Sequence, residues 1–110
     1  MTNYIYRRLA TADANIAVIN AGQTDLTGWS IHNTAGAARY VKLYNKATAP
    51  TASDTPAIVI ALAANGSATF NNSEGLNFSE GLGIRIVTGV ADNDATAPSA
   101  NDVVVNIFYY

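Results

Sequence analysis

Residues 57–63 read AIVIALA, and the spacing of the side chains in this stretch decides the fold class. Ile58, Ile60 and Leu62 fall on one face of an extended chain, and the residues between them fall on the other. A hydrophobic period of two residues is typical of a β-strand, because successive side chains of a strand point to opposite faces. The stretch therefore predicts a strand that turns one face toward a core.

The same period recurs on both sides of this stretch, in short segments that are separated by turn-forming residues. We expect strands at residues 3–10, 15–20, 25–33, 38–46, 57–63, 67–72, 82–90 and 102–110, with a short additional strand at 76–78. The proline-containing segments 47–56 and 91–101 are expected to be longer loops. Asn65-Gly66 predicts a tight hairpin, because both residues tolerate the positive φ of a type I′ turn.

Alternation also predicts which side chains leave the core. Tyr40, Lys42 and Tyr44 share the face opposite to Val41 and Leu43, and Arg85 points outward from its own segment. Both faces of the last segment, 102–110, are apolar, which predicts a central strand or a strand covered by a partner.

These segments predict an all-β fold in which residues 1–110 form a single domain. About eight short strands fit a two-sheet antiparallel sandwich of Greek-key or jelly-roll topology, and we favour the jelly roll. Alanine-rich runs at 12–17 and 61–64 could form short helices instead, since alanine is the best helix former. Each run is too short for a stable helix, so we expect strands and loops there.

The composition excludes several classes of function. A net charge of −2 provides no basic footprint for nucleic acid, and the absence of cysteine excludes disulfides and thiol catalysis. Residues 1–8 lack the basic start and apolar run expected of a secretion signal, and no apolar run approaches the ~20 residues of a membrane-spanning helix. We therefore expect synthesis in a cytoplasm, with neither a nucleic acid nor a membrane as partner.

Two candidate sites have simple alternative interpretations. His32 is the single histidine, and its alternation with Trp29 and Ile31 predicts a solvent-facing polar side chain rather than a catalytic one. Asp92-Asn93-Asp94 begins like a calcium-binding loop, but the glycine and glutamate that complete such a loop are missing, and a solvated turn explains the residues.

Glycines at 75, 81 and 83 lie near Glu74 and Glu80. A phosphate-binding loop would also need a lysine and a following helix, so the glycines are expected to permit a tight bend where the chain changes sheets. Nothing in the sequence sets the separation of the two glutamates that a glycosidase would need. We predict no catalytic residue, no metal site and no cofactor, and hence no enzyme.

The tyrosines are a better indication of an interface. Tyrosine and arginine are enriched at the centres of protein interfaces, and all six tyrosines occupy predicted strand positions. Ordinary packing of aromatic side chains on a sheet explains the pattern equally well. The predicted interface residues are Tyr4, Tyr6, Arg7, Tyr40, Tyr44, Phe108, Tyr109 and Tyr110.

The charges follow the strands as well. The basic residues fall inside predicted strands, whereas most acidic residues fall in loops. Protection of sheet edges and the turn preference of aspartate explain this distribution. Cationic sheet faces suited to an acidic partner are the alternative.

Two stretches carry a resemblance to a known family. The first is AARYVKLYNKATAP at 37–50, together with Thr55-Pro56 before an apolar strand. The second is GLGIRIVTGVADND at 81–94, together with NDVVVN at 101–106. Over about residues 28–110 the chain resembles small virion proteins of tailed bacteriophages, of the head decoration or capsid cement type.

The resemblance implies a β-sandwich or jelly-roll protein, often a homotrimer, that binds the major capsid protein and stabilises the shell. Its location would be the capsid exterior of the virion. The alternative function is a phage fibre or surface-adhesion module that recognises a carbohydrate or a host receptor. Trp29 and the loop at 92–94 are the candidate residues for that alternative.

Overall fold

The computed structural model describes residues 2–110, which form eight β-strands and no helix. The strands are β1 (Tyr4–Leu9), β2 (Ala17–Ala21), β3 (Thr24–Asn33), β4 (Arg39–Asn45), β5 (Ile58–Leu62), β6 (Ser67–Phe78), β7 (Gly81–Val87) and β8 (Val103–Tyr109). Sheet A has the order β1-β8-β3-β6 and sheet B the order β2-β7-β4-β5. Every pair of neighbouring strands is antiparallel.

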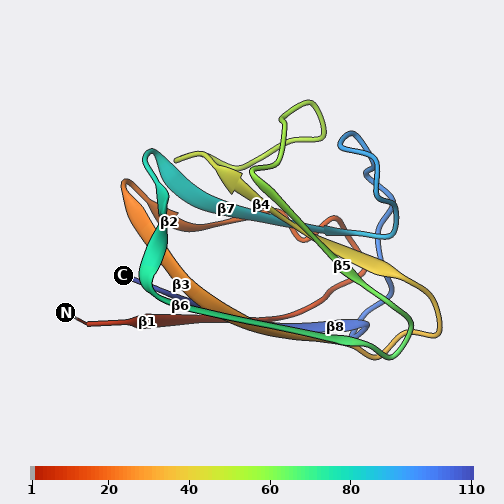
Figure 1. The fold of residues 1–110 in the computed structure, drawn as a ribbon. Helices are drawn as coiled ribbons and strands as arrows, with labels where there is room; N and C mark the ends of the chain where they lie inside the picture. The colour runs from red at the N-terminus through yellow and green to blue at the C-terminus, as the bar shows by residue number, and fades with distance from the viewer. Residues whose placement is uncertain (1) are drawn as a thin grey trace.

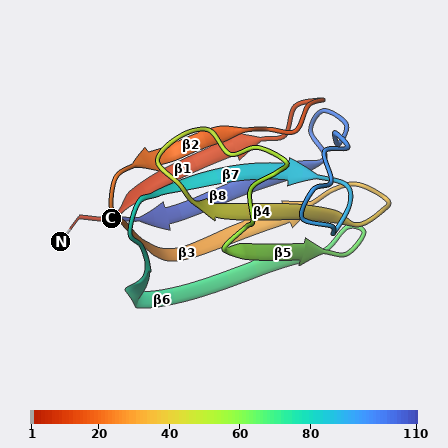
Figure 2. The same cartoon turned by 90° about the horizontal axis from the view of Figure 1, so that it is seen from above.

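The two sheets pack face to face as a sandwich (Figure 1). Seen from above, β2 lies over β1 at one edge of the sandwich and β5 lies over β6 at the other (Figure 2). Among the described strands, only β4 and β5 are consecutive in the chain and adjacent in a sheet. This alternation between two four-stranded sheets is the jelly-roll topology, so the predicted fold class is confirmed.

The core lies between the sheets and consists of the large side chains at alternate strand positions. β8 is central in sheet A, and its Val103, Val105 and Ile107 are fully buried, as its two apolar faces predicted. The other large members are Leu26, Ile31, Val41, Leu43, Ile60, Leu62, Phe78, Leu82, Ile84 and Ile86. The two-residue period of the sequence therefore fills one continuous apolar layer.

The predicted strands are all present, with one difference in β6. The sequence indicated two segments, 67–72 and 76–78, and the structure joins them into one strand. Opposite β6, Leu26 pairs with Leu76 whereas Gly28 pairs with Asn71, so extra residues of β6 bulge out of the ladder between them. Gly75 lies in this bulge with φ of 86°, a conformation that favours glycine.

The predicted hairpin at Asn65-Gly66 is wrong. The turn joins β5 of sheet B to β6 of sheet A, so the two strands do not pair. Asn65 has a φ of 56°, but Gly66 is not in the positive region, and the Gly66 amide donates to the Ala63 carbonyl at 2.8 Å. The chain reverses here between layers, which a local turn signal does not distinguish from a reversal within one sheet.

The glycine-rich region does include the expected change of sheets. Gly81 begins β7 directly after the chain leaves sheet A. A Cβ atom at this position would lie 2.7 Å from the carbonyl oxygen of Lys46, so the close approach of the two backbones requires glycine.

Candidate functional site

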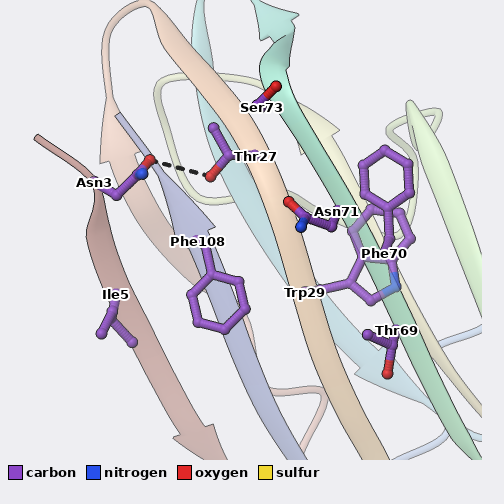
Figure 3. Close-up of a pocket in the computed structure, with 9 residues that line it drawn as sticks. All are labelled: Asn3, Ile5, Thr27, Trp29, Thr69, Phe70, Asn71, Ser73 and Phe108. Atoms are coloured by element: carbon purple, nitrogen blue, oxygen red, sulfur yellow. Dashed lines mark hydrogen bonds between the residues drawn. The ribbon is translucent and has the colours of Figure 1, made fainter. Parts of the chain in front are cut away.

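An open groove crosses the outer face of sheet A, between β1 and β6 (Figure 3). Its volume is about 520 Å³. The residues that line it are Asn3, Ile5, Thr27, Trp29, Thr69, Phe70, Asn71, Ser73 and Phe108. A volume of this size lies within the range of about 300–1,000 Å³ that is usual for small-molecule sites.

A glycine lies between two of the lining residues, in the middle of the sheet. The register places Gly28 of β3 between Phe108 of β8 and Asn71 of β6 on the same face. A Cβ atom on Gly28 would lie 2.5 Å from the Phe70 carbonyl oxygen and 3.4 Å from Phe108 Cδ2. Without a side chain at this position β3 and β6 approach closely, and Phe108 and Asn71 stand on either side (Figure 3).

Two of the lining residues are joined by a polar contact. Thr27 occupies the irregular position of β3, where the register shifts between Leu26 and Gly28. Its Oγ1 atom donates a hydrogen bond of 3.2 Å to Asn3 Oδ1 (Figure 3). The bulge in β3 therefore turns a hydroxyl toward the segment before β1.

The lining is uncharged. Four of its residues are apolar, and the remaining five are asparagine, threonine or serine. Trp29 and Phe70 stack on each other with ring centroids 4.6 Å apart. Alternation turns these two rings toward the inner face of sheet A, where Trp29 packs against the core, so Phe108 provides the aromatic ring of the outer face. The groove therefore suits a neutral ligand that has both an apolar face and hydrogen-bonding groups.

A second feature of the surface is an apolar edge on β1 and β2. Seven large hydrophobic side chains are exposed among residues 2–110, and five of them lie on β1 or at β2. These five, which we call the β1/β2 edge, are Tyr4, Ile5, Leu9, Ile16 and Val18. Exposed apolar side chains gathered on edge strands are typical of surfaces that bind other chains.

The outer face of sheet B carries a third feature, a buried pair of cations. Lys42 of β4 and Arg85 of β7 are directly opposite each other, with exposed fractions of 0% and 1%. The loops before β5 and before β8 lie over this face (Figure 1). The sequence correctly placed Arg85 on the outward face and Lys42 on the face opposite to Val41 and Leu43, but both side chains are buried there.

Backbone oxygens of the second loop hold these cations. Lys42 Nζ donates to the Ala91 carbonyl, and Arg85 Nη2 donates to the Asp94 carbonyl at 2.8 Å. Arg85 Nη1 donates to Tyr44 Oη at 3.1 Å, whereas the buried Nε has no partner among residues 2–110. Burial lowers the pKa of Lys42, and the charge of Arg85 lowers it further. The pair fastens the loop to the sheet and is not free to bind an acidic partner.

The structure separates the predicted interface residues into two groups. Most of them lie on β1, on β8 or directly after β8: Tyr4, Tyr6, Arg7, Phe108, Tyr109 and Tyr110. The rings of Tyr4 and Tyr109 are 5.6 Å apart, which joins the two strands at one end of sheet A. Tyr40 and Tyr44 lie on β4 of sheet B, and Tyr44 is buried beneath the loops.

The residues weighed for catalysis and metal binding form no complete site. His32 is exposed, as predicted, and its Nδ1 lies 2.7 Å from Ser67 Oγ. Within residues 2–110, no group of three His, Cys, Asp or Glu side chains could hold a metal ion. In the loop at 92–94, the Asp94 carbonyl accepts from a guanidinium, whose positive charge disfavours a cation there.

Trp29 and the loop at 92–94 do not form a common site. Trp29 belongs to sheet A, whereas this loop lies over the outer face of sheet B. The groove residues that sequence reasoning missed are Asn3, Ile5, Thr27, Thr69, Phe70, Asn71 and Ser73. Their separate segments become neighbours only through the strand order, so no local pattern marks them.

Comparisons with known proteins add one structural likeness. No protein-family model matches the chain, and no curated protein matches it. A solved structure similar to it is the Tobacco streak virus coat protein dimer, with 13% sequence identity and a TM-score of 0.38. The similarity covers 96% of this chain and 83% of that chain. It is a likeness to a viral coat protein and not to a phage decoration protein, and it is too low to assign a family or a function.

No helix in the described part of the chain is long and apolar enough to cross a membrane.

Proposed function

We propose that this chain is a structural subunit of a virion, and more specifically a decoration protein that binds the outside of a capsid and stabilises the shell. The observation that carries the proposal is the β1/β2 edge, where Ile5 is 71% exposed and Tyr4 is 56% exposed. The jelly-roll topology supports it, because this architecture recurs in viral capsid proteins. The sequence resemblance to small tailed-phage proteins gives the role its specific form.

The β1/β2 edge has the chemistry of an assembly surface. β1 is the outer strand of sheet A, so it has a hydrogen-bonding edge without a neighbouring strand of this sheet. Arg7 is exposed on the same strand, between Ile5 and Leu9 on its face. Burial of apolar side chains against a partner is the main favourable term in most protein association, and arginine adds directional hydrogen bonds.

The proposed partners are the major capsid protein and further copies of this chain, arranged as a homotrimer on the capsid exterior. A trimer presents three equivalent edges to a symmetric lattice, which provides avidity without strong individual contacts. Light scattering on the purified chain, whose mass is 11.5 kDa, is expected to give three times this value. A mass of a single chain at working concentrations would overturn the trimer.

Shell stability tests the role itself. Purified capsid shells are heated or osmotically shocked with and without the added chain, and the intact fraction is measured by electron microscopy. The proposal expects a larger surviving fraction with the chain and co-sedimentation of the chain with the shells. Equal survival together with no co-sedimentation would overturn it.

A further inference from the structure

We infer that the groove on the outer face of sheet A binds a neutral oligosaccharide. This inference goes beyond the structural role and concerns a different surface from most of the β1/β2 edge. On this face it presents the Phe108 ring together with amides and hydroxyls, and the lining contains no Asp, Glu, Lys, Arg or His. Sugar rings have the matching chemistry, since each has an apolar C–H face and a rim of hydroxyl groups.

The hydrogen-bonding groups of the groove are available to a ligand. Among the asparagines in the described strands, Asn71 is the one whose side chain makes no hydrogen bond within residues 2–110. Asn72 and Asn77, on the same strand, both accept hydrogen bonds through their side chains. Asn71 is exposed and lines the groove, so both its donor and its acceptor can meet a sugar hydroxyl.

The apolar wall stands on an interior strand. Phe108 belongs to β8, the strand that pairs with both β1 and β3 in the interior of sheet A. Its ring lies against the space above Gly28, where a Cβ atom would be 3.4 Å from Phe108 Cδ2. Because the backbone of an interior strand is already ordered, a ligand that binds to this ring costs little conformational entropy. A low entropy cost favours ligands that form only weak contacts, such as sugars.

The uncharged lining favours neutral ligands over charged ones. A sialylated or sulfated glycan would lose hydration of its anionic group, and no cation of the lining would compensate for that loss. The exposed charged residue on this face of β1 is Arg7, which is not part of the lining. Oligosaccharides of neutral hexoses and N-acetylhexosamines are therefore the expected class.

The test is a glycan array that carries neutral and acidic oligosaccharides, probed with the full chain and followed by calorimetric titration of each hit. Neutral glycans are expected to bind. Asn71→Ala and Phe108→Ala are each expected to weaken that binding at least tenfold. The matched control is Asn77→Ala, an exposed asparagine on the same strand outside the groove, which should change affinity less than twofold.

Several outcomes would overturn the inference. These are the absence of neutral glycan binding at millimolar concentration, binding of acidic glycans alone, or equal affinity of Asn71→Ala and the wild type. Displacement of the glycan by extended peptides of higher affinity would assign the groove to a protein segment instead. Circular dichroism of each variant establishes that it is folded, and Asn71→Ala remains decisive if Phe108→Ala does not fold. Attachment of Asn71→Ala to shells should be unchanged, which separates this site from the structural role.

Discussion

Lys42 and Arg85 lie directly opposite each other on β4 and β7, and both are buried although neither forms an ion pair with a carboxylate among residues 2–110. Two like charges this close repel each other, and burial adds the cost of lost hydration. Carbonyl groups of the overlying loop, at Ala91 and Asp94, offset part of this cost. The position of the loop therefore depends on the charges of the Lys42 and Arg85 side chains.

Arg85→Ala is expected to lower the free energy of unfolding by about 2–5 kcal/mol, because it leaves a cavity and removes the hydrogen bonds to Tyr44 and Asp94. Equilibrium urea denaturation measures the change. Arg7→Ala, at an exposed position, is the control and should stay within about 0.5 kcal/mol. Similar values for the two variants would contradict the structural role of Arg85.

The stability of the protein should depend on pH through Lys42. Burial and the charge of Arg85 lower its pKa below the ordinary value of 10.5, while Asp94 and Asp92 act in the opposite direction. Between the lowered pKa and 10.5 the unfolded chain binds more protons than the folded chain, so the free energy of unfolding rises with pH across this interval.

Lys42→Met removes the titrating group and keeps much of the side-chain volume. The wild type is expected to gain stability relative to Lys42→Met as the pH rises from neutral toward 10.5. Denaturant unfolding at each pH measures the difference between the two proteins in the free energy of unfolding. The contributions of the other titrating groups cancel in this difference. A difference that is constant with pH would show that the pKa of Lys42 is the same in both states.

Gly28→Ala tests the close approach of β3 and β6 beside the groove. The new methyl group would lie 2.5 Å from the Phe70 carbonyl oxygen, so β3 and β6 must separate. Overpacking of this kind typically costs about 1–3 kcal/mol in the free energy of unfolding. Gly36→Ala, where a Cβ atom meets nothing within 4 Å, is the control and should change stability by less than about 0.5 kcal/mol. Equal stability of the two variants would contradict the close approach at Gly28.

Val18 and Val59 form a matched pair for the proposed docking surface. They are 37% and 38% exposed and lie on the two opposite edge strands of sheet B, β2 and β5. Val18→Lys should reduce binding to capsid shells at least tenfold, because it places a charge in the apolar contact. Val59→Lys should bind as the wild type does, and a quantitative sedimentation assay distinguishes them. Loss of shell binding in Val59→Lys alone would show that the docking surface lies at the opposite edge, on β5.

The alternation of side chains sufficed to predict the strands and the class of fold. Segments such as Val103–Tyr109 carry their assignment in their own pattern, because the two-residue period is a local property. The pairing of strands is not local, and the turn at Asn65-Gly66 illustrates this. Its residues favour a tight reversal, but contacts distant in sequence decide that the chain enters the other sheet.

The candidate site was harder to predict for the same reason. The parity of Lys42 and Arg85 was correct, yet their burial depends on loops that the pattern could not position. Phe108, Gly28 and Asn71 belong to three strands and become neighbours only in the order β8-β3-β6. Tyr4 and Phe108, in contrast, were predicted as interface residues from residue type and strand position alone. In the structure, Phe108 lines the groove and Tyr4 belongs to the β1/β2 edge.

The pairing of β1 with β8 sets the order of events during synthesis. Tyr4 pairs with Tyr109, so the first strand waits for the last one to leave the ribosome before it finds its place. At about 5–20 residues per second, this wait lasts several seconds or more. Throughout it, the apolar side chains of β1 and both of its backbone edges are open to nascent chains nearby. Newly made chains therefore depend on rapid closure of sheet A, or on chaperones, to escape premature association.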